Sequence, residues 1–334
     1  MLKILSNIVS GYIMNEFKIA RDLGASWLES QIQNNGIIGD SIAGVTAYYK
    51  VPAALQVCGK TQQANRMIDW IRDFGLETNG DFGPRPKDEL KNYWYTYYNS
   101  WVVVGSQRLG QFDVAQKGMN FIKRFWDKES GGFFSDVEKK DKNTYQDLWV
   151  VAGNGIAAIY TGELEIAKSV GNWMQKLMDL QPEYPEKLYS VFNKSEGLIT
   201  EFKDDDIRFV MSANAERDQF FFHPGIAAGF LSRLYLHTNE KKWLELAKLY
   251  MLIAEKSSDY LWHTLRAGKV AWGNALLYRI TKEKKYYDMA IRAGKNIISQ
   301  QTKLGYWGME EMSSIDATAE LVYWLDEVYQ VTKN

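Results

Sequence analysis

Apolar and polar positions recur with helical spacing along the chain, in two kinds of segment. The first kind sets charged residues opposite an apolar stripe, and these segments cover 19–31, 64–74, 115–125, 167–177, 247–256 and 290–301. The second kind is poorer in charge and richer in glycine, alanine and valine, and covers 41–59, 95–110, 148–162, 223–238, 264–281 and 314–330. A helix that is apolar nearly all round lies inside an assembly, whereas an amphipathic helix lies on its outside. We therefore predict alternating outer and inner helices.

An alanine near the start of each outer segment recurs at a nearly regular interval. These alanines are separated by 44, 51, 52, 80 and 43 residues and are Ala20, Ala64, Ala115, Ala167, Ala247 and Ala290. A period of about fifty residues with two helices per unit is typical of repeat folds, whose units bury their apolar faces only against one another. We predict an all-α fold, an (α/α)6 toroid or barrel of six helical hairpins, as one domain over 1–334. The long interval holds an insertion at about 179–216, a candidate lid.

The lengths of the links predict where the functional face lies. Links from an inner to the next outer segment are short, whereas links from an outer to the next inner segment are mostly longer. Long loops gathered on one face of a rigid scaffold are where binding and catalytic residues are most often found. We therefore expect the mouth of the barrel at the N-termini of the inner helices.

Composition narrows the classes of function. The formal net charge is −1 and no basic stripe is present, so we expect no nucleic-acid partner. No apolar run approaches the eighteen or so residues of a membrane span, and the N-terminal stretch lacks a secretory cleavage pattern, so we expect a cytoplasmic protein. The single Cys58 argues against a cysteine-rich metal site. We predict neither metal nor cofactor, and a small-molecule substrate that a carrier protein could deliver.

One turn after an outer helix resembles a known motif. Gln301, Gly305 and Trp307 are similar to the QW motif of the squalene–hopene cyclase and protein prenyltransferase toroids, and Gln31 with Gly36 is a degenerate copy. The resemblance implies the toroid fold but not its chemistry, since the D-x-D-D acid motif and the zinc ligands of those families are missing. The run 203–206 is the nearest acidic cluster, and it falls in the insertion. The barrel also resembles, more loosely, unsaturated glucuronyl hydrolases, N-acylglucosamine epimerases and some polysaccharide lyases.

The candidate catalytic residues are those that fall at the predicted mouth and can exchange a proton: Asp147, His223, Asp40, Asp218 and Tyr97. Each aspartate has an alternative interpretation, because aspartate is a preferred helix N-cap. The helix dipole lowers the pKa of such a carboxyl group, whereas an apolar wall raises it. His223 is a candidate acid or base near neutral pH, with a packed structural histidine as the alternative.

The aromatic content is high, with 12 Trp and 20 Tyr, and suits a cavity wall as well as a core. The predicted substrate-binding residues are Tyr49, Trp94, Tyr145, Trp149, Arg217, Trp272 and Trp307. Such a wall stabilises cations and also stacks on sugar rings. Our first hypothesis is therefore a metal-independent cyclase or isomerase for a hydrophobic terpenoid, polyketide or alkaloid intermediate.

Two alternatives stay open. The cations nearest the mouth are Arg217 and Lys269, and a fixed positive charge there would suit an anionic substrate. The first alternative is therefore a hydrolase, lyase or epimerase acting on an acidic sugar. The second is a scaffold without activity.

Overall fold

The computed structural model describes residues 15–39, 44–85, 93–203, 206–309 and 312–333. The inner helices are α3 (Val51–Val57) with the short α2 (Val45–Tyr48) before it, α6 (Tyr95–Arg108), α8 (Leu148–Thr161), α10 (His223–Thr238), α12 (Gly268–Thr281) and α14 (Ser314–Thr332). The outer helices are α1 (Glu16–Ser30), α4 (Thr61–Trp70), α7 (Phe112–Ile122), α9 (Leu164–Asp179), α11 (Lys241–Lys256) and α13 (Lys284–Ser299). Short irregular helical turns cover Ile71–Gly75, Lys123–Phe125, Asp259–His263 and Leu265–Ala267.

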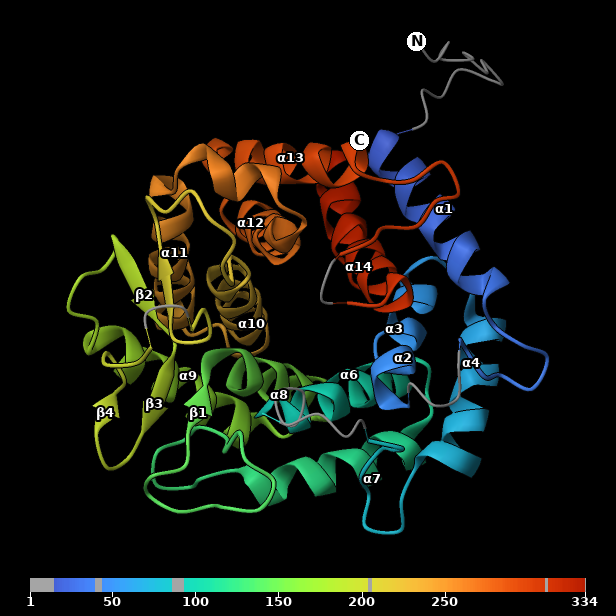
Figure 1. Cartoon of the computed structure of the whole chain (residues 1–334), viewed down its shortest axis with the longest axis horizontal. Coiled ribbons are helices and arrows are strands. Elements are labelled where there is room, and N and C mark those ends of the chain that lie inside the picture. The colour runs from blue at the N-terminus through green and yellow to red at the C-terminus, as the bar shows by residue number, and fades with distance from the viewer. Residues whose placement is uncertain (1–14, 40–43, 86–92, 204–205, 310–311, 334) are drawn as a thin grey trace.

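The inner helices form a closed ring (Figure 1). Each contacts the next in the order α3, α6, α8, α10, α12 and α14, and α14 contacts α3 again. The outer helices surround this ring, each packed on one inner helix. Helix α1 packs on α14, so the first and last helices together make the sixth hairpin. The predicted (α/α)6 toroid is confirmed.

Burial follows the hydrophobic pattern. The inner helix α6 is buried without interruption from Thr96 to Ser106, whereas the outer helix α13 buries mainly one stripe. Glycines bring inner helices into close contact: a Cβ on Gly225 would lie 2.2 Å from the carbonyl oxygen of Lys269, and one on Gly229 would meet the ring of Trp272 at 2.4 Å. Only glycine permits α10 and α12 to approach so closely.

The QW-like motif holds a turn of the outer ring together. Gln301 Nε2 donates hydrogen bonds to the carbonyl oxygens of Gly305 (2.7 Å) and Ala20 (2.8 Å), which joins the turn after α13 to α1. Gly305 has a φ of 95°, a conformation that favours glycine. The Trp307 indole is fully buried and donates to the carbonyl oxygen of Ile297 (2.7 Å). Trp307, a predicted substrate-binding residue, therefore packs among the helices α1, α13 and α14.

The insertion forms small antiparallel sheets beside α9 and α11 (Figure 1). Its strands are β2 (Lys187–Tyr189), β3 (Val191–Asn193), β4 (Gly197–Leu198) and β5 (Val210–Ser212); β2 pairs with β5, and β3 pairs with β4 and with β1 (Gln146–Asp147). The Ser258 amide donates to the carbonyl oxygen of Ala213 (2.8 Å), which ties the insertion to the end of α11. Its role as a lid stays a prediction.

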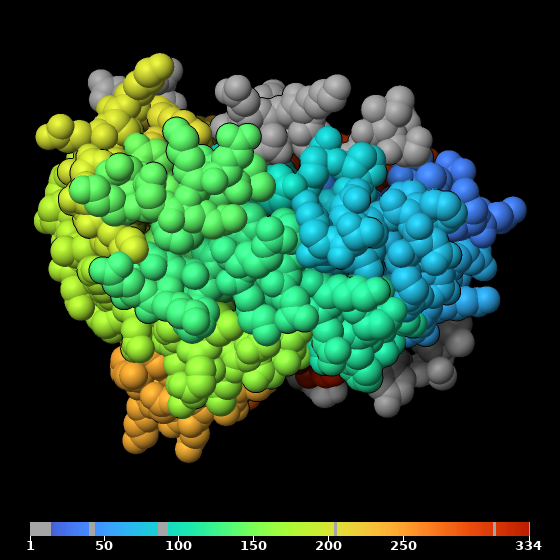
Figure 2. Space-filling view, turned by 90° about the horizontal axis from the view of Figure 1, so that it is seen from below, coloured from blue at the N-terminus to red at the C-terminus, as the bar shows by residue number. Residues whose placement is uncertain are grey.

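Helix α7, the loop after it, α4 and the insertion cover the side wall of the toroid (Figure 2). None of the described helices is long and apolar enough to cross a membrane.

Candidate active site in the lumen of the toroid

Asp147 ends strand β1 and is the N-cap of α8. One carboxylate oxygen accepts a hydrogen bond from the backbone N–H of Trp149 (2.8 Å), and the other accepts one from the Tyr93 hydroxyl (3.4 Å). The residue is 1% exposed. Burial raises the pKa of Asp147 to about 7, although the amides of Trp149 and Val150 oppose the shift. The helix cap and the titratable group are therefore the same carboxyl group.

A cluster of buried charges lies across the ring from Asp147. Lys50 follows α2, Lys269 lies in the first turn of α12, and Asp316 and Glu320 lie on α14. The Lys50 Nζ pairs with Asp316 Oδ1 (3.0 Å) and with Glu320, whose other oxygen pairs with Lys269. The Tyr49 hydroxyl donates to Asp316 Oδ2 (3.0 Å). We call Lys50, Lys269, Asp316 and Glu320 the lumen ion cluster.

The pKa values within the lumen ion cluster follow from burial and pairing. Burial lowers the pKa of Lys269 to about 8, with Glu320 opposing and Lys50 reinforcing the shift. Burial alone would raise the pKa of Glu320, but Lys269 and Lys50 lower it to about 2, so Glu320 stays ionised. Burial would lower the pKa of Lys50, but Asp316 and Glu320 raise it. Burial raises the pKa of Asp316. The cluster thus balances two cations against two carboxyl groups.

His223 begins α10, between Asp147 on α8 and Lys269 on α12. It is fully buried, with its ring 5.0 Å from that of Phe222. Neither ring nitrogen has a hydrogen-bond partner among the described residues. Burial, and then the charge of Lys269, lowers the pKa of His223 to about 3. The imidazole is therefore neutral at pH 7, and the role of His223 as an acid or base stays a prediction.

Aromatic side chains form a connected wall around these groups. The ring centroids are 5.0 Å apart for Trp94 and Trp149, 4.6 Å for Trp149 and Tyr97, and 5.4 Å for Trp101 and Trp324. The same wall continues through Trp272, which stacks on Trp324 at 4.5 Å. The Lys269 ammonium lies over it, 5.6 Å from the ring of Trp149 and 5.6 Å from that of Trp324.

Among the described residues, many polar atoms of this wall lack a hydrogen-bond partner, as do the buried indoles of Trp173 and Trp243 on the outer helices. Within the described part of the chain, no hydrogen-bond partner exists for the buried Tyr97 hydroxyl or for the indole N–H groups of Trp94, Trp101, Trp149, Trp272 and Trp324. Buried polar atoms are nearly always hydrogen-bonded in native proteins, so a connected set of exceptions requires an explanation. Apolar ring faces interspersed with donors match a ligand that has both C–H faces and hydroxyl groups.

The remaining predicted site residues lie elsewhere. Asp218 and Arg217 are exposed at the surface, and Asp218 pairs with Arg266 Nε (2.8 Å). Tyr145 is half-buried and packs edge-on against Phe209 at 5.7 Å. Asp40 lies outside the described residues. The structure thus brings together Asp147, His223, Tyr97 and Tyr49 with most of the predicted tryptophans.

Two members of the lumen ion cluster, Lys50 and Glu320, were not among the candidates from the sequence. The sequence does indicate them, because both are isolated charges in apolar segments. Lys50 is the only lysine or arginine in the inner segment 41–59. Asp316 is the only charged residue that precedes Glu320 in the inner segment 314–330. A charge inside an otherwise apolar helix is expensive to bury unless it is paired. Isolated charges in inner helices are therefore candidates for one another's partners.

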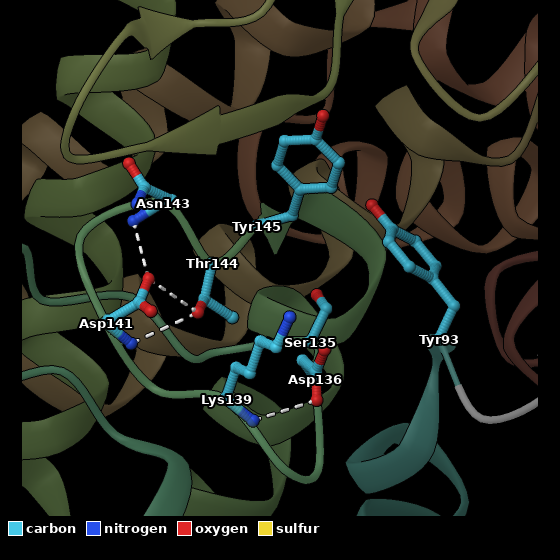
Figure 3. A pocket seen from close by; sticks show the side chains of 8 residues that line it. All are labelled: Tyr93, Ser135, Asp136, Lys139, Asp141, Asn143, Thr144 and Tyr145. Atoms are coloured by element: carbon cyan, nitrogen blue, oxygen red, sulfur yellow. Dashed lines mark hydrogen bonds between the residues drawn. The ribbon is translucent and has the colours of Figure 1, made fainter.

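A cavity of about 310 Å³ opens between Tyr93 and the loop before β1 (Figure 3). It is lined by Tyr93 and by residues of the loop before β1: Ser135, Asp136, Lys139, Asp141, Asn143, Thr144 and Tyr145. We call it the side pocket. Tyr93 both lines the side pocket and donates to Asp147, so one side chain contacts the pocket and the carboxyl group.

Comparison with solved structures finds toroids of similar fold, several of them named as carbohydrate enzymes. It is similar to a D-mannose isomerase over 96% of this chain and 100% of that one, with 12% identity and a TM-score of 0.72. It is also similar to a glycoside hydrolase family 76 α-1,6-mannanase from Salegentibacter sp. HEL1_6 (94% and 99% covered, 11% identity, TM-score 0.68). A family 76 α-mannanase from Bacteroides thetaiotaomicron matches with 11% identity and a TM-score of 0.63, covering 95% and 96%. No protein-family model and no curated protein matches significantly.

These likenesses correct the family suggested by the QW-like turn. They show the toroid fold and give no support to the terpenoid cyclase family, since the three neighbours described above are named as sugar enzymes. The hypothesis of a cyclase for a hydrophobic natural product is contradicted. The QW-like turn misled because Gln301 and Trp307 serve the packing of hairpins, which toroids of different chemistry share.

Proposed function

We propose that this protein is a sugar isomerase or epimerase that moves a proton next to the carbonyl carbon of a neutral sugar in the lumen. The observation that carries the proposal is an arc of three buried titratable groups on successive inner helices: Asp147 on α8, His223 on α10 and Lys269 on α12. The aromatic wall with its unpartnered donors frames this arc.

The wall supports a sugar as the ligand. A sugar ring offers apolar C–H faces for the rings of Trp149 and Trp94, and hydroxyl oxygens for their indole N–H groups. Each such hydrogen bond satisfies a buried donor that otherwise lacks a partner among the described residues. A purely hydrocarbon ligand leaves these donors unsatisfied.

The ion cluster supports a neutral sugar over an acidic one. The expectation of an acidic substrate rests on a fixed cation at the mouth, yet Lys50 and Lys269 are both paired with Asp316 and Glu320. Arg217, the other cation considered, is exposed at the surface. A carboxylate on the sugar would meet a cluster whose charges already balance.

The pKa values of Asp147 and Lys269 suit proton transfer near neutral pH. A general acid or base works best when its pKa lies near the working pH. Asp147, with a pKa of about 7, donates its proton to the carbonyl oxygen of the open-chain sugar. Lys269, with a pKa of about 8, takes the proton from the neighbouring carbon in its neutral form. The enediol then accepts the proton from Lys269 at the former carbonyl carbon and gives the proton of its other hydroxyl to Asp147, which yields the isomer and restores both groups.

Glu320 stabilises the positive charge that forms on Lys269 in this step. As Lys269 gains the proton, its developing positive charge faces the ionised Glu320, which is already in place. When Lys269 is neutral, Glu320 keeps its second partner Lys50, so no carboxylate is left unpaired. His223 stays neutral between the two groups and offers one donor and one acceptor to the substrate hydroxyls.

Proton exchange with solvent tests the proposal. The protein is incubated in D2O with D-mannose, D-glucose, D-fructose and N-acetyl-D-glucosamine, and each sugar is followed by NMR. We expect deuterium at the carbon next to the carbonyl together with formation of the isomer or epimer. Lys269→Met removes both signals. If no sugar exchanges its proton while a glycoside releases reducing sugar, the isomerase proposal is wrong.

A glycoside hydrolase is the second candidate, and one observation favours it. Asp147 and Asp316 belong to helices α8 and α14, which stand on opposite sides of the ring, and both carboxyl groups have a raised pKa because of burial. Glycosidases use a pair of carboxyl groups that flank the glycosidic bond. Release of reducing sugar from α-1,6-linked mannan, with no deuterium exchange into free mannose, would select this function.

A further inference from the structure

We infer that the substrate carries a second sugar, and that the side pocket binds it. This inference rests on the proposed function, since it places the reacting sugar in the lumen beside Asp147. It adds that the substrate is a disaccharide or the end of a longer chain. Small-molecule sites measure roughly 300–1,000 Å³, and the side pocket, at about 310 Å³, has room for about one sugar ring.

The side pocket is joined to the reacting group by two contacts. The Tyr93 hydroxyl donates to the Asp147 carboxyl group (3.4 Å), and the Ser135 hydroxyl accepts from the Asp147 backbone N–H (3.1 Å). A ring bound in the side pocket is therefore separated from Asp147 by one side chain. That arrangement fits two sugars joined by one glycosidic oxygen, with Tyr93 beside the linkage.

The lining of the side pocket suits a hydroxylated ring. Tyr93 and Tyr145 contribute two aromatic rings to its lining, and Ser135, Lys139 and the segment 141–144 contribute polar groups (Figure 3). Aromatic faces take the C–H face of a sugar, and hydroxyl and carboxylate oxygens take its hydroxyl groups. Asp136 and Asp141 make the lining acidic, which disfavours a uronate at this position.

The loop is held in shape before any ligand binds. Asp136 Oδ1 accepts from the Glu138 and Lys139 amides (2.7 and 3.0 Å), and Asp141 Oδ1 accepts from the Asn143 amide (2.8 Å). Each carboxylate thus uses one oxygen to fix the loop, and none of the described residues donates to the other oxygen. Those second oxygens are acceptors for sugar hydroxyl groups. A preformed loop also lowers the entropic cost of binding.

Arg208 of the insertion supports Tyr93 from outside. Its guanidinium lies 5.0 Å from the centroid of the Tyr93 ring and 5.6 Å from that of Phe209, and it is held by an ion pair with Asp206 (2.5 Å). Tyr145 packs on the same Phe209. The insertion therefore positions both tyrosines of the side pocket.

The test compares one-ring and two-ring ligands on the full chain. Binding of D-mannose and of α-1,6-mannobiose, with D-glucose and cellobiose as a second pair, is measured by calorimetry, and turnover is measured in the exchange assay. We expect at least one disaccharide to bind about tenfold more tightly than its monosaccharide, because the second ring adds its own contacts. Asn143→Trp, which fills the side pocket from an exposed loop position, abolishes that preference and leaves monosaccharide binding within about twofold.

The control is Lys142→Ala, an exposed neighbour outside the lining, which leaves both affinities unchanged. Equal affinity for one-ring and two-ring ligands in the unmodified protein overturns the inference, as does a preference that survives Asn143→Trp. If a disaccharide preference is present and is lost in Asn143→Trp while no proton exchange occurs, the side pocket stands and the isomerase proposal fails. If monosaccharides exchange their proton and no disaccharide is preferred, the isomerase proposal stands and the second sugar site is wrong.

Discussion

The two ends of the inner ring hold buried charges in different ways. At the N-terminal end, the mouth, the inner helices contribute the lumen ion cluster, Asp147, His223 and the aromatic wall. At the C-terminal end they contribute a second set, which we call the basal ring: Gln56, Arg108, Tyr160, Arg233, Arg279, Tyr323 and Glu327. Every inner helix contributes to both ends, and of the basal ring Arg279 is exposed.

The difference lies in how the polar groups are satisfied. In the basal ring each side chain bonds another: Arg108 donates to Gln56 (2.7 Å) and to the hydroxyls of Tyr160 and Tyr323 (3.1 Å each), and Arg233 pairs with Glu327. At the mouth, the described residues provide no partner for the His223 nitrogens, the Tyr97 hydroxyl or several indoles. One end uses its polar groups for its own stability, while the other leaves them available to a ligand, as expected where function and stability compete.

The largest effect is expected at Asp147. Asp147→Asn keeps the helix cap but cannot donate the proton, so kcat should fall by about 10²–10⁴-fold while the fold is retained. In the unmodified protein, activity should be greatest between about pH 7 and 8 and fall on either side, because Asp147 loses its proton at higher pH and Lys269 is protonated at lower pH. Initial rates across a pH series measure both effects. Asp218→Asn is the control, since that exposed carboxylate should change neither the rate nor the profile.

A substitution in the basal ring should lower the free energy of unfolding and leave kcat/KM unchanged. Glu327→Gln removes the ionic partner of the buried Arg233, and breaking such a pair costs about 3–5 kcal/mol. Chemical denaturation gives the free energy of unfolding, and kcat/KM is measured on the folded fraction. A large loss of kcat/KM in the folded variant would contradict the separation of the two ends. Glu320→Gln at the mouth should instead lower both quantities.

Low pH should destabilise the folded protein, because the buried His223 resists protonation. Its pKa of about 3 lies below the ordinary value of 6.5, so the neutral form is favoured by folding. This contribution to stability is complete above about pH 6.5 and is lost as the pH falls toward 3, by up to about 1.4 kcal/mol per pH unit. His223→Leu should flatten the pH dependence of Tm below pH 6.5. His237→Gln, at an exposed position, should leave it unchanged.

The smallest effect separates two tryptophans, the partly buried Trp149 and the fully buried Trp307. Trp149→Phe removes an indole N–H that has no partner among the described residues, so we expect a several-fold higher KM and little change in stability. Trp307→Phe removes an indole that donates to the carbonyl oxygen of Ile297, so we expect about 1 kcal/mol lower stability and an unchanged KM. If Trp149→Phe lowers stability and Trp307→Phe raises KM instead, our assignment of Trp149 to the site and of Trp307 to the packing between helices is wrong.

Some parts of the candidate site were predictable because they depend on local sequence. Asp147 and His223 stand directly before or at the start of apolar helical segments, so the toroid fold alone brings them to the mouth. Trp149 and Tyr97 follow from the same placement. Trp307 could not be assigned in this way, because its position after an outer helix is compatible either with the lumen or with the packing between helices. Only the bond from its indole to Ile297 decides between them.

The sequence by itself determined the alternation of outer and inner helices, and it predicts which face carries the mouth, because hydrophobic periodicity, glycine positions and link lengths are local properties. Only the tertiary structure decided that α1 closes the ring on α14, and that Lys50 and Lys269 meet at Glu320, 270 and 51 residues away along the chain. It also decided the protonation of Asp147 and His223. Closure and burial depend on how all six hairpins pack together, and burial sets the pKa of each group by removing it from water.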